Sequence, residues 1–200
     1  YTPIFVRSIW LALIATVICL LIAYPLSYIL TGINKKSQST MLMIVMLPMW
    51  MNFLLRTYAW MTLLGNNGLI NSFLGFFNLG PFKMLNTEGA VVLGMVYNYL
   101  PFMILPLHTV ISSIDKSYIE AAEDLGADKS NVFLKTILPL SVSGIISGIT
   151  MVFIPTISTY AISQLLSNGT IFLFGDSIQM KFEQGLYGVG SIMSIVMLIF

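Results

Sequence analysis

The sequence predicts an all-α integral membrane protein, a polytopic helical bundle, from three observations. Hydrophobic residues make up 57% of its 200 residues and charged residues 8%, with a mean hydropathy of +0.90, whereas soluble domains carry about 25% charged residues. Long uncharged runs are present, and about 20 apolar residues suffice to cross a bilayer as a helix. Ten-residue segments of alternating hydrophobicity are absent, which favours helices over a barrel.

The first half of the chain predicts two spans. Residues Ser8 to Asn34 carry no charge, and Pro25 within them is expected to kink the helix. A polar loop from Asn34 to Gln38 follows. The second span is expected from near Met41 to about Leu64, with Arg56 in its final third, where a long side chain can reach the interface.

Three more spans and two outer connections are expected after this point. The apolar piece GLINSFLGFFNLG is too short to cross, so it predicts an interfacial or re-entrant helix inside a glycine- and asparagine-rich connection. The remaining boundaries are that connection (Leu64 to Glu88), a third span (Gly89 to Ser112), a fourth span (Leu140 to about Ser163), an outer connection (Ser167 to Gly185) and a fifth span from near Leu186 to Phe200.

One loop, residues 113–138, carries eight of the seventeen charged residues of the chain, between Asp115 and Lys135. Apolar segments long enough to cross a bilayer flank it on both sides. A charged, helix-forming segment in that position must lie in water at the membrane surface. It is therefore where this protein is expected to meet a soluble partner.

Within this loop the pattern predicts a helical hairpin. Ser117 and Glu120 have the S-x-x-E spacing of a capping box, which predicts a helix start at Ser117. Gly126 can end that helix in a left-handed conformation. A second helical pattern runs from about Asp128 to Pro139. The apolar face of the first helix would hold Tyr118, Ile119, Ala122 and Leu125, and its polar face Glu120, Glu123 and Asp124.

This loop resembles the EAA loop of the permease subunits of ABC importers, whose pattern is EAA, three residues, G, nine residues, I, one residue, LP. Thr136 stands where the pattern has isoleucine, with Ile137 one place on. The resemblance implies a cytoplasmic loop whose helix docks in a cleft of an ATPase subunit. It implies ATPase-coupling roles for Glu120, Ala121, Ala122, Gly126, Leu138 and Pro139.

Four longer segments are similar to the B-type permease of spermidine/putrescine importers: SIWLALIATVICLLIAYPLSYIL, LPMWMNFLLRTYAW, YNYLPFMILPL and FGDSIQMKFEQGLYGVGS. The resemblance implies one permease domain over residues 1–200, of the type I ABC importer kind, with about five spans of a six-span subunit. It implies a second, C-type permease, an ATPase dimer and an extracytoplasmic polyamine-binding protein as partners, in the plasma (inner) membrane of a bacterium.

Lysines predict the orientation. Lys35 and Lys36 lie in one short loop, and Lys116, Lys129 and Lys135 lie in the loop 113–138; the positive-inside bias places both loops in the cytoplasm. The basic residues expected on the outer side of the membrane are fewer: Arg7, Lys83 and Lys181. Tyr1 is then outside, and at least one further span before it is expected.

Several kinds of chemistry find no support in the sequence. It has no GxxxxGK[ST] phosphate loop, so energy from ATP must come from a partner. It has no HExxH, GxSxG or Cys/His cluster, a single cysteine (Cys19) and no basic cluster suited to nucleic acid. We therefore expect no enzyme activity of its own, no cofactor and no metal. The lone histidine, His108, is expected to be a polar interfacial side chain, with a proton relay as the alternative.

Polar and aromatic residues near the spans predict the translocation pathway, because aromatic rings attract organic cations. An acidic group could pair with an ammonium at the outer mouth. The alternative for each is an ordinary interfacial aromatic belt or polar side chain. The candidates are Trp50, Asn52, Tyr58, Tyr97, Asn98, Tyr160 and Asp176. Prolines 25, 48, 101, 106 and 155 fit kinked helices that line a pathway.

Other functions stay open at this point. A permease of another importer branch, for thiamine, iron or a sugar, would keep the same loop and differ only in its cavity. An ion-coupled secondary transporter would need paired intramembrane carboxylates, which the predicted spans lack. A membrane enzyme would need a catalytic constellation, and none is evident.

Overall fold

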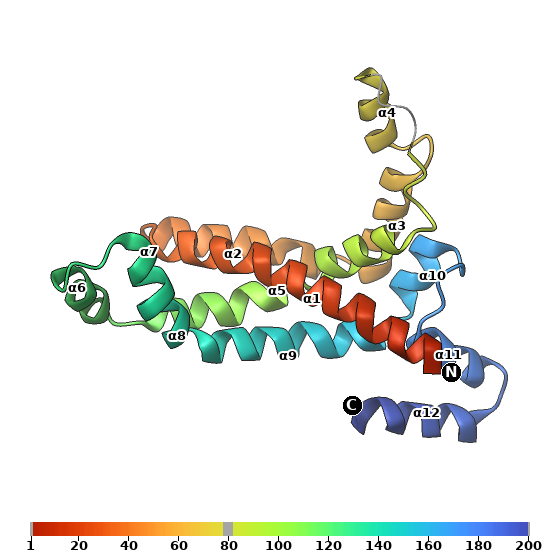
Figure 1. Ribbon diagram of the computed structural model, residues 1–200. Helices are drawn as coiled ribbons and strands as arrows, with labels where there is room; N and C mark the ends of the chain where they lie inside the picture. Colours follow the sequence, from red (N-terminus) through yellow and green to blue (C-terminus); the bar gives the residue numbers. More distant parts are fainter. Residues whose placement is uncertain (1, 78–81, 200) are drawn as a thin grey trace. The chain divides into compact units, whose positions relative to one another are not determined.

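The computed structural model describes residues 2–77 and 82–199, and every regular element among them is a helix (Figure 1). Its contacts divide the chain into two compact units. Unit 1 takes in residues up to Thr16, Met49–Asn98 and the residues from Phe153 on; unit 2 takes in Val17–Pro48 and Tyr99–Val152. We describe each unit by itself.

Unit 2 holds the charged loop and the helices that carry it. It comprises the second part of α1 (Thr2–Thr31), most of α2 (Lys35–Trp50), the second part of α5 (Glu88–Ser113), α6 (Lys116–Asp124), α7 (Lys129–Val132), the π-helical turn η1 (Phe133–Ile137), α8 (Leu138–Leu140) and the first part of α9 (Val142–Ser158). In Figure 1 the α6–α8 segment lies at the end of unit 2 where α2 begins and α5 ends.

A pair of glycines lets α9 approach α5 closely in unit 2. A Cβ at Gly148 would lie 2.6 Å from the Met103 sulfur, and one at Gly144 would lie 3.1 Å from the Pro106 carbonyl oxygen. The two glycines are four residues apart, the small-xxx-small spacing that brings membrane helices together by van der Waals packing. Met103, Ile104 and Leu107 are completely buried in this unit.

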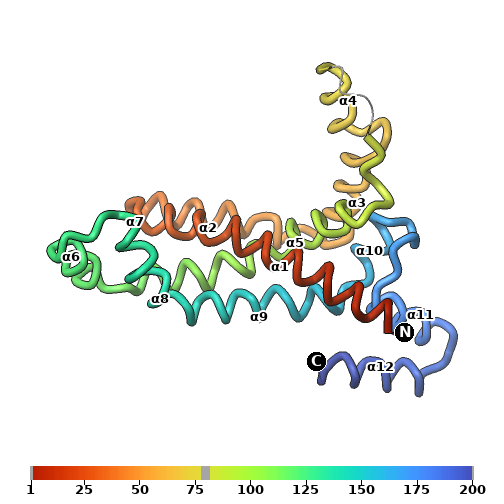
Figure 2. Tube along the Cα trace, viewed as in Figure 1, coloured from red at the N-terminus to blue at the C-terminus, as the bar shows by residue number. Residues whose placement is uncertain are grey.

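Unit 1 is built from shorter helices. It comprises the first part of α1, α3 (Phe53–Leu64), α4 (Leu69–Phe76), the first part of α5, the end of α9, α10 (Ala161–Ser167), α11 (Phe174–Glu183) and α12 (Tyr187–Ile199). Helix α3 packs on α10, and α11 packs on α12. Figure 2 traces the turn that reverses the chain between α11 and α12.

Two of the described helices, α1 and α5, are long and apolar enough to cross a membrane by themselves. Two bent pairs could each supply another crossing, Lys35–Trp50 with Phe53–Phe76 and Lys129–Leu140 with Val142–Ser158, while α12 is shorter. Large apolar side chains stay exposed on α1, such as Leu21 at 68% and Ile29 at 61%. Such a surface is suited to lipid or to another apolar helix.

The predicted boundaries of the first two spans need correction. The predicted loop from Asn34 to Gln38 is wrong, because α2 begins at Lys35 and the Asn34 side chain caps it by accepting the Ser37 N–H at 2.9 Å. The predicted continuous second span is also wrong. It breaks at Asn52, whose Oδ1 accepts the Leu54 N–H at 2.8 Å and so starts a new helix, α3.

The third span is confirmed as α5, which accommodates Pro101 and Pro106. The fourth was predicted to reach Ser163, but α9 ends at Ser158. Tyr160, with φ −126° and ψ −37°, leaves the helical conformation before α10 begins. The predicted outer connection from Ser167 to Gly185 contains a helix, α11, that the sequence did not predict.

The short helix expected after the second span is confirmed as α4; residues 78–80 of its apolar piece lie outside the described residues. Its buried Asn71 holds the surrounding connection together. The Asn71 amide donates to the carbonyl oxygens of Gly65 and Phe82, and its Oδ1 accepts the Phe82 N–H, each at 3.0 Å.

Candidate functional site

The first helix of the charged loop, α6, begins at a different residue from the predicted one. Asp115 is its N-cap, and its Oδ1 accepts the Ser117 N–H at 3.0 Å. The predicted start at Ser117 is therefore wrong, because the carboxylate of Asp115, two residues earlier, accepts the Ser117 N–H and caps the helix. Hydrogen bonds from the Ser117 backbone and side chain lower the pKa of Asp115, so the cap is an ionised carboxylate near neutral pH.

The predicted end of this helix at Gly126 is confirmed. Gly126 has φ +82°, its N–H donates to the Glu123 carbonyl at 2.8 Å, and the Ala127 N–H donates to the Ala122 carbonyl at 3.1 Å. This pair of bonds is a Schellman motif. A Cβ at Gly126 would meet no atom within 4 Å, so the backbone conformation, not the space, requires glycine here.

Helix α6 buries none of its residues in unit 2. Tyr118 is 57% exposed, and Leu125, just beyond the helix, is 89% exposed. Glu120 and Ala121 are also exposed, while Ala122 is half-buried. An exposed apolar strip on a short helix with small alanines beside it is a surface on which a partner protein can pack closely.

The second arm of the loop runs from α7 to α8. Asp128 caps α7 by accepting the Asn131 N–H at 3.0 Å, which confirms the predicted start. The chain then takes a π-helical turn, η1, a form that often marks functional sites. Ile137 is 2% exposed and Thr136 is half-buried, so Ile137 makes the deep apolar contact next to Leu138 and Pro139, two of the residues predicted to couple to an ATPase.

Aromatic contacts that the sequence did not predict anchor this arm to α1. The Phe133 ring contacts Tyr24 edge-on, with centroids 5.6 Å apart, and Tyr28 edge-on at 5.4 Å. The Tyr24 hydroxyl also lies 2.7 Å from the Ser141 hydroxyl. The four-residue spacing of Tyr24 and Tyr28 was the available signal, since it places both rings on one helix face.

The seven predicted pathway residues all belong to unit 1, but the structure does not gather them into one site. Trp50 is 71% exposed at the end of α2, and Tyr58 on α3 is 47% exposed. Asn52 serves as the cap of α3. Tyr97 packs edge-on against Trp60, with ring centroids 5.2 Å apart.

Asn98 is one of two pathway candidates with an unsatisfied buried oxygen. It is 2% exposed. Its amide donates to the Gly94 carbonyl at 2.8 Å, while its Oδ1 has no hydrogen-bond partner among the residues that the structure describes. Leaving a buried acceptor unpaired costs about 1–3 kcal/mol, so this oxygen is available to a donor that enters unit 1.

Asp176 is the second pathway candidate with an unsatisfied buried oxygen, and it is 1% exposed. Its Oδ2 accepts the Leu173 N–H at 2.7 Å and the Ser163 hydroxyl at 2.8 Å, while its Oδ1 has no hydrogen-bond partner in the described part of the chain. Burial raises the pKa of Asp176 to about 6, against the lowering effect of these two bonds. The Ser163 hydroxyl also lies 2.7 Å from the Tyr160 carbonyl, so Ser163 links these two predicted residues.

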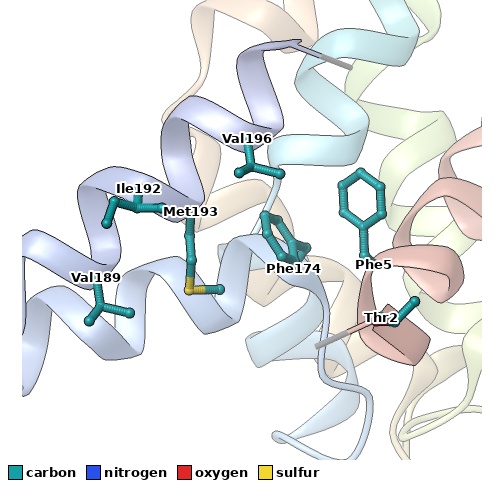
Figure 3. A pocket seen from close by; sticks show the side chains of 7 residues that line it. All are labelled: Thr2, Phe5, Phe174, Val189, Ile192, Met193 and Val196. Atoms are coloured by element: carbon teal, nitrogen blue, oxygen red, sulfur yellow. The ribbon is translucent and has the colours of Figure 1, made fainter.

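Unit 1 also contains an apolar hollow of about 460 Å³ between α1, α11 and α12 (Figure 3). Phe5 and Phe174 meet in it edge-on, with ring centroids 5.0 Å apart. Its lining consists of Thr2, Phe5, Phe174, Val189, Ile192, Met193 and Val196. With no charged side chain in this lining, the hollow suits lipid or another apolar helix and not a polycation.

Comparison with known proteins places this architecture in a family. The family model for the binding-protein-dependent transport system inner membrane component matches residues 1–200. The spermidine/putrescine transport system permease protein PotB of Haemophilus influenzae is 39% identical over 188 residues, covering 91% of this chain and 66% of that protein. The Escherichia coli protein of the same name is 35% identical over 184 residues, covering 91% and 67%. The chain thus spans about two thirds of the length of these relatives.

Solved structures agree on the fold. A chain of the bacterial alginate ABC transporter in complex with an alginate pentasaccharide-bound periplasmic protein superposes with a TM-score of 0.71 at 19% identity, over 98% of this chain and 75% of that one. A second alginate importer structure gives 0.70 at 18% identity, over 97% and 75%. This chain therefore belongs to the family of binding-protein-dependent transport system inner membrane components, the permease subunits of ABC transporters.

Proposed function

We propose that this chain is the permease subunit of an ATP-driven importer that carries polyamines, spermidine or putrescine, across a bacterial inner membrane and forms half of the translocation pathway. The observation that carries the transport role is the exposed helix α6, which ends in the Schellman turn at Gly126 and presents the EAA spacing. The polyamine assignment is supported by relatives at 35–39% identity that are named for spermidine and putrescine.

Residues 1–200 form, on this proposal, one permease domain whose loop 113–138 lies in the cytoplasm. Lys35 and Lys36 at the start of α2 carry the same sign as the lysines of the loop, as the positive-inside bias requires. The proposed partners are an ABC ATPase dimer on α6, a C-type permease for the second half of the pathway and an extracytoplasmic polyamine-binding protein.

The proposed mechanism is alternating access driven from α6. ATP binding closes the ATPase dimer, and the docked segment from Glu120 to Gly126 moves with it. The ring contacts of Phe133 with Tyr24 and Tyr28 then pass that movement to α1. Because a coupling free energy acts only through differential binding, the two conformations must differ in affinity for polyamine or for the binding protein.

The pathway residues stay proposals with supporting observations. The Trp50 and Tyr58 rings are exposed and can face a cation, as can Tyr160, which lines a hollow of about 440 Å³ with Gln179 and Ser158. Asp176 and Asn98 each hold an unpaired buried oxygen, the kind of acceptor that an ammonium group needs. The fold does not determine the substrate, because an alginate transporter has the same fold.

The test is ATP-dependent uptake of labelled spermidine and putrescine into proteoliposomes that hold both permeases, the ATPase and the binding protein. Uptake should require ATP and should cease with an ATPase that cannot hydrolyse it. If ATP hydrolysis responds to the binding protein while neither polyamine enters, the substrate assignment fails and the coupling role stands. If the complex assembles without any ATPase bound to loop 113–138, the coupling role fails.

A further inference from the structure

A polar cleft of about 730 Å³ in unit 2 has no part in the coupling scheme. It lies where α1 turns into α2 and where α5 ends and α6 begins. Its lining consists of Thr31, Ile33, Asn34, Lys35, Gln38, Ser39, Leu42, His108, Ile111, Ser112, Ile114, Lys116 and Ile119.

The charge in this cleft is of one sign. Lys35 opens α2 and Lys116 opens α6, so two separate elements each bring an ammonium group to it. No aspartate or glutamate is among the lining residues, and within the described ranges neither lysine forms an ion pair. Asp115, next to Lys116 in sequence, is held on the cap of α6 by the Ser117 N–H.

The lining also includes a partly buried polar pair and several apolar side chains. His108 is 9% exposed and is hydrogen-bonded to the Gln38 amide, which joins α5 to α2. Isoleucines from three elements, Ile33, Ile111 and Ile119, line the same space. The cleft therefore combines cationic groups with a hydrocarbon wall, the two halves of a site for an amphiphilic anion.

The position of the cleft along α1 and α5 indicates which kind of anion it binds. α1 ends at Thr31 and α5 at Ser113, and both helices are long and apolar enough to cross a membrane. Where both helices cross a bilayer, their ends fall near the phospholipid headgroups, and basic pockets between membrane helices bind anionic headgroups.

We propose that this cleft binds a phosphate-bearing anion, and that its occupant is the headgroup of an anionic phospholipid. Lys35 and Lys116 bind the phosphate, and the isoleucines contact the start of the acyl chains. Free inorganic phosphate shares the headgroup chemistry but leaves the apolar wall uncovered. Assigning the site to the cytoplasmic leaflet rests on the proposed orientation; binding itself does not.

Such an occupant would act on coupling. Lys116 and Ile119 are residues of α6, so a bound headgroup would hold the start of the coupling helix against the α1–α2 turn. Transport per ATP hydrolysed should then rise with the content of anionic lipid.

The experiment uses the assembled transporter in nanodiscs of phosphatidylcholine containing a minor fraction of phosphatidylglycerol. The test variant is Lys35→Gln with Lys116→Gln. The matched control is Lys36→Gln with Lys129→Gln, which removes one exposed lysine of α2 and one of the loop 113–138, neither of which lines the cleft. Phosphatidylglycerol retained after delipidation is counted by mass spectrometry. We expect its binding to weaken about 30-fold in the test variant and less than twofold in the control.

Two further arms separate the outcomes. The variant Lys35→Arg with Lys116→Arg keeps both charges and should retain the lipid. Excess inorganic phosphate should not displace the bound phosphatidylglycerol. If phosphate does displace the lipid, and if phosphate binding is lost in the glutamine variant, the site belongs to free phosphate. Equal lipid loss in the test and control variants, or loss in neither, would overturn the proposal.

Discussion

The Tyr24 hydroxyl lies 2.7 Å from the Ser141 Oγ in a buried hydrogen bond between residues 117 positions apart. Tyr24 belongs to α1, and Ser141 is the single residue between α8 and α9. The bond joins the end of the charged loop to α1 at the point where Phe133 also contacts Tyr24. Ser141 thus connects α1 to the loop that is proposed to meet the ATPase.

The first prediction concerns this anchor. Phe133→Ala should lower the unfolding free energy by about 1–3 kcal/mol, because two edge-on ring contacts are lost at about 0.5–1.5 kcal/mol each. ATP hydrolysis should persist while polyamine uptake per ATP falls several-fold. Leu134→Ala, at a position 57% exposed, is the control and should change neither quantity. Unaltered uptake per ATP in Phe133→Ala would remove the anchor from the mechanism.

The second prediction concerns the turn that ends α6. Gly126→Asp should abolish uptake and leave membrane insertion intact, because a side chain at φ +82° strains the backbone by about 1–2 kcal/mol and the new charge disturbs docking. Gly126→Ala should show a smaller loss from strain alone. Gly188→Ala is the control, since Gly188 has open space and an ordinary φ. Normal ATP-driven uptake by Gly126→Asp would refute the docking role.

The third prediction concerns the pH dependence of stability through Asp176. Its pKa rises from 3.8 to about 6 in the folded protein, so between these values the folded state binds more protons than the unfolded state. Stability from this group should therefore fall by up to about 3 kcal/mol as pH rises from about 4 to about 6. Asp176→Asn should flatten that part of the curve in thermal unfolding of the purified complex. A wild-type curve that Asp176→Asn leaves unchanged would contradict the burial of this carboxyl.

Asp176→Asn also tests the proposed pathway. The asparagine Oδ1 can still accept from Leu173 and Ser163 in place of the carboxylate oxygen, so assembly should be kept. The missing charge should weaken polyamine uptake, measured as the rate in proteoliposomes. Uptake equal to that of the wild type would leave Asp176 with a purely structural role between α10 and α11.

The fourth prediction concerns the connection after α3. Asn71→Ala removes three hydrogen bonds to Gly65 and Phe82, at about 1 kcal/mol each. Amide hydrogen exchange around α4 should quicken, and proteolysis there should become easier. Asn66→Ala, at an exposed position nearby, is the control. Equal protection in both variants would show that other contacts hold α4.

The sequence alone determined the features that depend on a few neighbouring residues. Uncharged runs longer than 20 residues predict membrane helices because about 20 residues of helix cross a bilayer's hydrocarbon core, and two of these runs are the long helices α1 and α5. Gly126 predicted a turn because only glycine takes positive φ without strain. Two neighbouring residues, Asp115 and Ser117, could each cap α6. The sequence pattern predicted Ser117, whereas Asp115 is the cap in the structure.

The tertiary structure decided what depends on residues distant in the chain. The sequence singled out Asp176 as a candidate acidic residue, but only the tertiary structure gives its partners inside unit 1, the Leu173 N–H and the Ser163 hydroxyl. No spacing rule relates Tyr24 to Ser141 or Lys35 to Lys116, since only packing brings them together. The physical reason is that backbone propensities act over a few residues, whereas burial and charge pairing depend on which helices meet.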